Sequence, residues 1–314
     1  MFRMGLVLAY FVLSAWGAVY SQETPATPDA SLRAIHMANA REGWAVGDDG
    51  LILHTVDGWE THEIQRSGVR VSLRGVHFVN AFVGFVVGSE ALPYGRGTGG
   101  VVLATSDGGT TWTKCIHREL PGLYGVKFLD AKHGYAFGDT MGSHTGGIFF
   151  TDNGGKTWKS CDALAPQTGW LAGTVVQDQP VAVGTEGKFG LLEKSHVLPM
   201  QMKDSLPVTW TAIAGNSQDV WAVGTQAAVM VSRATFGKSF ERVHLPIPAC
   251  FQQQMDFNSV CVLGDNIWIT GRPGTCLVHS PDRGKTWKIV STGQPLPLNH
   301  VQFVDEKTGY IVGE

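Results

Sequence analysis

The chain has 314 residues, of which 40 are glycine, 10 % are aromatic and only 16 % are charged. This composition is typical of many short strands joined by tight turns, and it does not favour long solvent-exposed helices. The formal net charge of −3 argues against a nucleic-acid-binding protein, because such proteins normally carry a clustered basic excess.

The N-terminus has the pattern of a targeting segment followed by a linker. Arg3 is the only charged residue before an apolar run over residues 5–13, and small residues suited to cleavage follow up to Ser21. We therefore predict a signal peptide over residues 1–21. A retained membrane anchor is the alternative, although the apolar stretch is marginal for spanning a bilayer. Residues 22–31 are polar and proline-rich, which indicates a linker.

One short pattern then recurs along the chain: an aromatic or large apolar residue, two small or apolar residues, and a glycine. These landmark glycines are Gly47, Gly88, Gly138, Gly184, Gly224, Gly271 and Gly313. Their spacing of 40 to 50 residues matches the repeat length of a propeller blade. Apolar residues around each landmark alternate with a period of two, which excludes a helical repeat.

We predict an all-β fold, a β-propeller of four-stranded antiparallel blades over residues 32–314. The blades are expected to begin near residues 32, 73, 123, 168, 210, 257 and 298. The seventh repeat is truncated after its second strand, at Gly313 and Glu314. Because a propeller leaves a free sheet edge unless its last blade is completed, we expect a piece of a longer protein. An open ring, or six blades with a partial seventh, is the alternative.

The turn between the third and fourth strands carries an Asp-box motif, S/T-x-D-x-G-x-T-W. Residues 280–287 fit it at every position with Ser first, residues 105–112 fit it with Thr first, and residues 151–158 have Thr first and Asn at the Asp position. An Asp or Asn side chain in such a turn accepts backbone N–H groups, and the Trp folds back over it. We therefore interpret the motif as structural, with these residues carrying it: Asp107, Trp112, Asn153, Trp158, Asp282 and Trp287. The turn at Asp57 misplaces the aromatic residue and is interpreted as a decayed copy.

The pattern W-A-V-G-x-x-G-x-I-L-x-T over residues 44–55, together with SDGGTTW and DNGGKTW, resembles the photosystem II stability/assembly factor family. That family belongs to the wider bacterial-neuraminidase-repeat propellers, and the resemblance covers the chain from about residue 32 onward. It implies a seven-bladed propeller that helps to assemble the reaction-centre core on the lumenal side in photosynthetic organisms. Similar domains occur in bacteria without photosystems, so we expect a periplasmic or extracellular protein, and a thylakoid-lumen protein only in a photosynthetic host.

Function is expected on the face where second strands lead into third strands, because long loops on a rigid scaffold commonly carry it. Two of these loops are long, at residues 89–100 and 139–147. The candidate partner-binding residues of this rim are Asp48, Glu90, Tyr94, Arg96, Asp139, His144, Glu186 and Arg272. The alternative is that they are solvated loop residues without a partner.

An enzyme is the competing interpretation, since sialidases also carry Asp boxes. Sialidases need three arginines for the substrate carboxylate. The first strands offer Arg33 and Arg74 and the loops offer Arg96 and Arg272, but the R-I-P signature is absent. A glycosidase pair of carboxylates would be Asp48 with Asp139 or Glu186, although any propeller rim offers such pairs.

No metal or cofactor is expected, because the eleven histidines show no ligand spacing and no calcium-loop pattern occurs. His36 and His77 occupy matching positions in two first strands, which predicts a shared packing role. The five cysteines include no CxxC pair, and no disulfide is assigned. We expect an exported, monomeric, non-catalytic scaffold, not membrane-spanning after signal removal, that binds a protein or membrane-protein segment. The alternative is a secreted glycan-binding or sialidase-like propeller.

Overall fold

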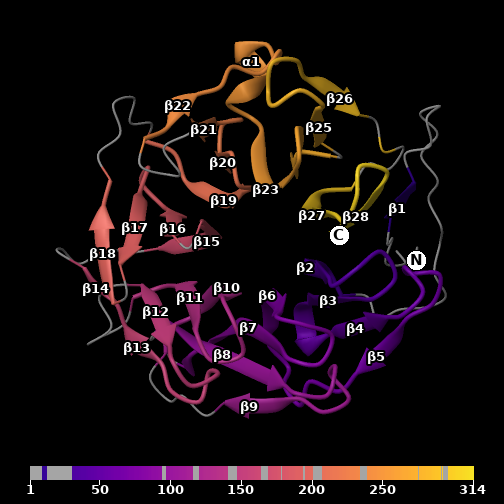
Figure 1. Ribbon diagram of the computed structural model, residues 1–314, viewed down its shortest axis with the longest axis vertical. Helices are drawn as coiled ribbons and strands as arrows, with labels where there is room; N and C mark the ends of the chain where they lie inside the picture. Colours follow the sequence, from indigo (N-terminus) through magenta and orange to yellow (C-terminus); the bar gives the residue numbers. More distant parts are fainter. Residues whose placement is uncertain are drawn as a thin grey trace.

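The computed structural model describes residues 9–12, 30–93, 97–115, 120–140, 147–163, 169–177, 179–193, 195–200, 207–233, 239–274, 276–290, 292 and 296–314. These residues form seven β-sheets arranged in a ring around a central axis (Figure 1). The all-β prediction is confirmed, since the helical elements that the structure describes in full are the short α1 (Ala249–Gln252) and a 3-10 turn at Asp48–Gly50. No helix within these ranges is long and apolar enough to cross a membrane.

Six sheets each contain four consecutive antiparallel strands, of which the first lies innermost. The first blade consists of β2 (Leu32–Met37), β3 (Gly43–Gly47), β4 (Ile52–Thr55) and β5 (Glu63–Gln65). The second consists of β6 (Ser72–Phe78), β7 (Gly84–Ala91), β8 (Thr98–Thr105) and β9 (Thr113–Cys115). The third consists of β10 (Leu123–Phe128), β11 (Gly134–Gly138), β12 (Ile148–Thr151) and β13 (Lys159–Ser160). The fourth blade consists of β15 (Trp170–Val176), β16 (Gln179–Gly184), β17 (Phe189–Glu193) and β18 (His196–Pro199). The fifth consists of β19 (Trp210–Gly215), β20 (Asp219–Gly224), β21 (Val229–Arg233) and β22 (Glu241–Arg242). The sixth consists of β23 (Asp256–Leu263), β24 (Asn266–Arg272), β25 (Cys276–Ser280) and β26 (Lys288–Val290). A short strand, β14 (Asp162–Ala163), adds to the fourth blade in parallel with β18.

The seventh sheet has three strands. β27 (Leu298–Phe303) and β28 (Thr308–Gly313) form the expected hairpin, and β1 (Ala9–Val12) pairs antiparallel with β28. The seven repeats therefore correspond to six four-stranded blades and one three-stranded sheet. β1 lies within the segment that the sequence predicts to be a signal peptide, and that assignment stays a prediction.

The landmark glycines are required by close backbone packing. A Cβ atom at Gly47 would lie 2.2 Å from the carbonyl oxygen of Ser31, which is the residue before β2. At the other six landmarks the equivalent distance to a backbone carbonyl oxygen is between 2.1 and 2.4 Å. Because the obstacle is backbone and not a movable side chain, each inner hairpin closes only with glycine at this position.

The aromatic residue of the landmark packs against the next blade. Trp44 stacks on Phe78 with ring centroids 3.5 Å apart, and the same relation joins Phe85 to Phe128 at 3.5 Å. Trp268 stacks on Phe303 at 3.7 Å. In each case the partner is the phenylalanine that ends the first strand of the following blade. These stacked pairs bury large apolar rings between the sheets, where most of the core lies.

The turns with the Asp-box motif are held by their own side chains. The Asp107 carboxylate accepts hydrogen bonds from the Thr111 backbone N–H (2.9 Å) and the Thr111 hydroxyl (2.7 Å), and Thr105 Oγ1 accepts one from the Gly109 N–H (2.8 Å). These bonds stabilise the hairpin turn itself. The same set occurs around Asp57, so this turn keeps the hydrogen bonds of the motif and departs from it in the position of its aromatic residue, Trp59.

Candidate functional site at the mouth of the central channel

Every first strand contains a β-bulge at its second or third residue, directly after its first large apolar residue. In β2, Leu32 pairs with Gly47 and Ala34 pairs with Val46, so Arg33 has no partner in the ladder. A bulge of this kind turns the side chain of its extra residue away from the sheet. The seven bulge residues are Arg33, Arg74, Tyr124, Leu171, Thr211, Asn258 and Asn299.

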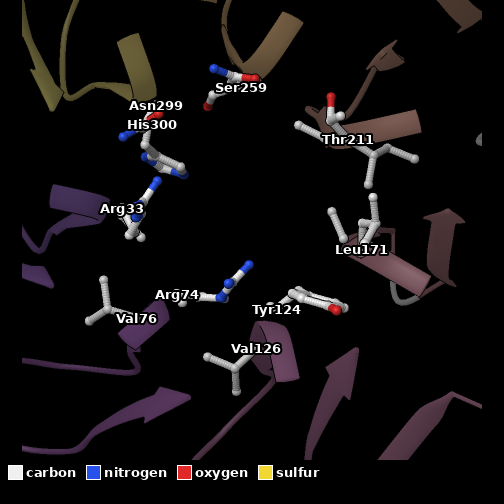
Figure 2. Close-up of a pocket in the computed structure, with 18 of the residues that line it drawn as sticks. Arg33, Arg74, Val76, Tyr124, Val126, Leu171, Thr211, Ser259, Asn299 and His300 are labelled. Atoms are coloured by element: carbon white, nitrogen blue, oxygen red, sulfur yellow. The ribbon is translucent and has the colours of Figure 1, made fainter. Parts of the chain in front are cut away.

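The bulge residues surround a cavity of about 540 Å³ at the centre of the ring. All seven first strands contribute to its wall, and their small residues, such as Gly75 and Gly125, keep it open. Figure 2 shows Arg33, Arg74 and Tyr124 on one side of the cavity. The cavity is the mouth of the central channel.

Three bulge side chains on the other side tie neighbouring blades together. Thr211 Oγ1 donates a hydrogen bond to the backbone carbonyl of Phe257, the first apolar residue of the next inner strand (2.5 Å). Asn258 and Asn299 repeat this contact with the carbonyls of Leu298 (3.0 Å) and Leu32 (2.8 Å). The polar groups of this half of the ring are therefore used within the fold.

On the opposite side, Arg33 is held by a carboxylate. Its guanidinium donates two hydrogen bonds to Asp48, at 2.6 and 3.3 Å, and the Ser72 hydroxyl donates a third at 2.6 Å. Burial would raise the pKa of Asp48, but the hydrogen bonds from Arg33 and Ser72 and the charges of Arg33 and Arg74 outweigh it and hold that pKa below its ordinary value. Asp48 is therefore ionised and fixed.

Arg74 and Tyr124 form the next part of the ring. The guanidinium carbon of Arg74 lies 5.2 Å from the centroid of the Tyr124 ring, a cation–π contact. The Tyr124 hydroxyl donates to Asp139 (2.8 Å), which also accepts from the Thr98 hydroxyl (2.8 Å). Burial, followed by the hydrogen bond and charge of Asp139, raises the pKa of Tyr124 to about 12. Among the described residues, Arg74 pairs with no carboxylate.

The structure brings two of the rim residues expected from the sequence into this site. Asp48 and Asp139 each follow a landmark glycine, and each binds the bulge residue of its own blade. Glu186 instead pairs with Lys188 at 3.2 Å, and Arg272 pairs with Asp256 at 3.1 Å. Glu90 is exposed on β7, where it lies opposite Gly99. Tyr94, Arg96 and His144 lie outside the described residues.

Both ends of the long loop expected at residues 89–100 belong to strands. β7 continues to Ala91 and β8 begins at Thr98, so the two strands form a hairpin that extends beyond the landmark glycine. Gly99 also makes a bridge with Pro121, just before β10. Gly100 packs closely against the same segment, since a Cβ atom there would lie 2.4 Å from the carbonyl oxygen of Pro121.

Sequence reasoning missed the ring of bulge residues as a group. Arg33 and Arg74 were considered only as sialidase-type arginines, and Tyr124 was not considered. One sequence signal could have revealed these residues. In each repeated first strand, a position of variable residue type lies between a large apolar residue and a mostly small one, as in LRG at Leu73 and LYG at Leu123. Its residue types differ from blade to blade, which hides their common place.

Within the described ranges, no group of three or more His, Cys, Asp or Glu side chains is placed to hold a metal ion. Cys115, Cys250, Cys261 and Cys276 are free thiols. The mouth therefore offers fixed hydrogen-bonding groups, an aromatic ring and an arginine, Arg74, that has no carboxylate partner in the part of the chain that the structure describes. This is the chemistry of a recognition site for a polar ligand.

Comparisons with known proteins agree with this architecture. The model of the family described as "Photosynthesis system II assembly factor YCF48" matches residues 21–189 and 194–311. Two relatives, both "Photosystem II assembly protein Ycf48" from Synechococcus strains JA-2-3B'a(2-13) and JA-3-3Ab, are 24 % identical over 285 and 184 residues. The alignments cover 87 % of this chain and 79 % of the first relative, and 55 % and 52 % for the second.

Solved structures of similar proteins show the same fold. One described as "YCF48 bound to D1 peptide" has a TM-score of 0.70 at 18 % identity, with 100 % of this chain and 97 % of that chain covered. A second, "YCF48 from Cyanidioschyzon merolae", has a TM-score of 0.67 at 20 % identity, with 92 % and 94 % covered. On the match of the family model to most of its length, the chain belongs to the YCF48 family of photosystem II assembly factors.

Proposed function

We propose that the protein is a non-catalytic assembly factor that holds an extended segment of a partner protein at the mouth of the central channel. The observation that carries this proposal is the asymmetry of the bulge ring. Three bulge side chains donate hydrogen bonds to backbone carbonyls of the next blade: Thr211, Asn258 and Asn299. Arg74, in contrast, points into the mouth without a carboxylate partner among the described residues. The segment binds on the side of β2, β6 and β10.

The chemistry of Arg74 favours a polar or acidic peptide. A guanidinium that lies over an aromatic ring keeps its N–H donors directed outward, where they suit a carboxylate or backbone carbonyl. Arg33, Tyr124 and their carboxylate partners hold the neighbouring surface rigid, which lowers the entropic cost of binding. The similar propeller whose structure is described as bound to a D1 peptide supports a peptide as ligand.

A glycosidase at the same mouth has less support. Such an enzyme needs one carboxyl group with a raised pKa as proton donor. Asp48 has a lowered pKa, and both it and Asp139 are held by donors from neighbouring side chains. The family relatives carry the names of assembly proteins, which also supports a binding role.

The binding proposal is tested by fluorescence anisotropy with a labelled D1 peptide and the full chain. We expect Arg74→Gln to weaken binding at least tenfold at low salt, because one charge-assisted contact is worth about 1.5 to 3 kcal/mol. The matched control is Arg242→Gln, which removes an exposed arginine on the outer strand β22 and should leave binding unchanged. Equal affinities of wild type and Arg74→Gln, with both proteins folded, would exclude this binding surface.

We also propose that the protein is exported and monomeric, with cleavage after Ser21. The apolar run at residues 5–13 and the small residues before Gln22 support this assignment. N-terminal sequencing of protein recovered from the native host tests it, and a mature chain starting at Gln22 is the expected result. Recovery of membrane-bound protein that retains residues 1–21 would favour the anchor instead. Sedimentation of the mature protein tests the monomer.

A further inference from the structure

A second cavity lies in the first blade, and we call it the side cavity. Its volume is about 660 Å³, and residues 48–51 and 64–70 line it together with Ala30. The walls are therefore the 3-10 turn, the end of β5, which is the outermost strand of this blade, and the connection from β5 to β6 (Figure 1). Of the described residues, none lines both the side cavity and the central mouth.

The walls of the side cavity are held in place by the backbone. The Gly50 N–H donates a hydrogen bond to the carbonyl of Val71 (2.8 Å), and the Ser67 hydroxyl oxygen accepts one from the Val69 N–H (3.3 Å). Gly50 has a φ of 74°, and a Cβ atom there would lie 2.0 Å from the carbonyl oxygen of Val69. The turn and the connection are therefore in a contact that requires glycine. The cavity is formed before a ligand arrives, which lowers the entropic cost of binding.

The inner surface of the side cavity is largely apolar. Ala30 and Leu51 are buried within it, at 7 % and 6 % exposure. Ile64 on β5 forms part of the wall and is nevertheless 57 % exposed. A concave apolar surface with an exposed isoleucine at its edge suits one apolar side chain of a ligand.

Most polar groups of the lining are already used within the fold. Asp48 accepts hydrogen bonds from Arg33 and Ser72, as described for the mouth. The Gln65 amide donates to the carbonyl of Gly108 in the second blade (3.2 Å). These groups therefore hold the walls and are not free to bind a ligand.

Two arginines at the edge of the side cavity remain free. Arg66 and Arg70 are exposed, and neither pairs with a carboxylate among the described residues. Asp49 is the one lining carboxylate, among the described residues, that is not bound to an arginine. The edge thus carries two positive charges against one negative charge. This excess favours an acidic ligand, since guanidinium groups bind carboxylates with two donors at once.

We propose that the side cavity holds an apolar side chain of an acidic, extended segment of a partner protein, with flanking carboxylates bound to Arg66 and Arg70. The inference rests on the proposed peptide-binding function and adds the sequence that the partner presents: an apolar residue flanked by Asp or Glu. Arg70 is four positions before Arg74, which lines the mouth. Their Cα atoms are therefore at most about 14 Å apart. One extended segment reaches both sites when about four residues separate the two anchored positions.

The test is saturation-transfer NMR of the tripeptide acetyl-Glu-Leu-Glu-amide in millimolar excess over the full chain. The leucine methyl protons should receive the strongest saturation. Acetyl-Lys-Leu-Lys-amide should bind at least tenfold more weakly, because its charges oppose those of Arg66 and Arg70. No saturation of the leucine methyl protons, or equal binding of the two tripeptides, overturns the proposal.

Variants locate the binding site. Ile64→Asp should weaken binding of acetyl-Glu-Leu-Glu-amide at least fivefold, and Arg66→Gln/Arg70→Gln at least tenfold. The matched control is Ile289→Asp, because Ile289 is the central residue of the outer strand β26 and is 62 % exposed. It should bind as wild type, and so should Arg242→Gln, the control for the arginines. Unchanged binding in both side-cavity variants refutes the site. Binding to a chain without residues 22–29, but not to the full chain, would assign the cavity to the acidic segment that contains Glu23 and Asp29, and would overturn the partner assignment.

The labelled D1 peptide separates this proposal from the proposed function. We expect Ile64→Asp to weaken its binding at least threefold, in addition to the effect of Arg74→Gln. Weaker binding in Arg74→Gln alone would keep the mouth as the peptide site and refute the side cavity. Weaker binding in Ile64→Asp alone would keep the side cavity and refute the mouth.

Discussion

Arg283, in the Asp-box turn of the sixth blade, forms two hydrogen bonds with the carboxylate of Asp219, at the start of β20 in the fifth blade. The distances are 2.9 Å from Nε and 2.8 Å from an Nη atom, and the Asp219 side chain is only 2 % exposed. Arg233 approaches the same carboxylate to 3.5 Å. The turn thus joins two neighbouring blades through a buried charge.

Replacement of Arg283 by methionine should destabilise the propeller by about 2 kcal/mol. The loss leaves the buried Asp219 carboxylate with only the longer contact from Arg233, and breaking one side of a buried pair is costly. Urea unfolding of the variant and wild type measures the difference. The control is Lys285→Met, which changes an exposed residue of the same turn and should alter the free energy of unfolding by less than about 0.5 kcal/mol.

The double variant Arg283→Met/Asp219→Ala tests whether the pair, and not either residue alone, is responsible. With both charges removed, no buried carboxylate is left unpaired, so its cost should be smaller than the sum of the two single costs. Additive costs would show that Arg283 and Asp219 stabilise the blades independently of each other.

Most of the fold could be predicted from the sequence because its requirements are local and repeated. A nearby carbonyl oxygen leaves room only for glycine at the landmark position, and the landmark aromatic residue stacks on a ring of the next blade. Both residue types therefore recur along the chain. The candidate site follows a different rule. A β-bulge is a property of the backbone, and the side chain that it redirects is free to vary from Arg33 to Leu171.

Contacts between blades were also beyond sequence reasoning. Asp48 and Asp139 could be named because they follow a landmark, but nothing in the sequence pairs Asp48 with Ser72 of the next blade. The contact between Arg283 and Asp219 spans 64 positions and joins two blades. Such pairs depend on how neighbouring sheets face each other, which the repeat pattern does not specify.

Asp282→Asn should make the protein less sensitive to acid while keeping the turn. Hydrogen bonds from the hydroxyl and backbone N–H of Thr286 are the main cause that lowers the pKa of Asp282 to about 2. Because the folded pKa lies below the unfolded value of about 3.9, this stabilisation is complete above about pH 4 and is lost as the pH falls towards 2. Asn153 already fills the same position in the third blade.

The measurement is the urea midpoint of Asp282→Asn and wild type from pH 5 to pH 2. The wild-type midpoint should fall more steeply below pH 4 than that of the variant. Asp265→Asn, which removes an exposed carboxyl group from the same blade, is the control and should follow the wild-type curve. Parallel curves for wild type and Asp282→Asn would show that this carboxylate does not contribute to acid sensitivity.

His36 on β2 and His300 on β27 should make the propeller less stable between pH 6.5 and pH 4. His36 and His300 have pKa values of about 3 and about 4 in the folded protein, against about 6.5 when unfolded. The unfolded chain therefore binds more protons in this range, and stability falls as the pH drops below 6.5. At pH 5 each histidine accounts for about 2 kcal/mol of this loss.

His36→Gln and His300→Gln should each flatten the dependence of unfolding free energy on pH, measured in buffer free of phosphate. The control is His244→Gln, which changes an exposed histidine and should retain the wild-type dependence. If all four proteins lose the same stability from pH 7 to pH 5, the pKa values of His36 and His300 do not differ between the folded and unfolded states.

Gly224→Ala should destabilise the fifth blade by about 3 kcal/mol. The added Cβ atom would lie 2.3 Å from the carbonyl oxygen of Thr209, and neither backbone can withdraw without breaking the pairing of β19 with β20. Gly264→Ala is the matched control: its Cβ meets no atom within 4 Å, so only its positive φ of 58° is unfavourable, at a cost of about 1 kcal/mol. Urea unfolding separates the two, and equal costs would mean that the landmark glycine is needed for chain flexibility and not for the close approach of two backbones.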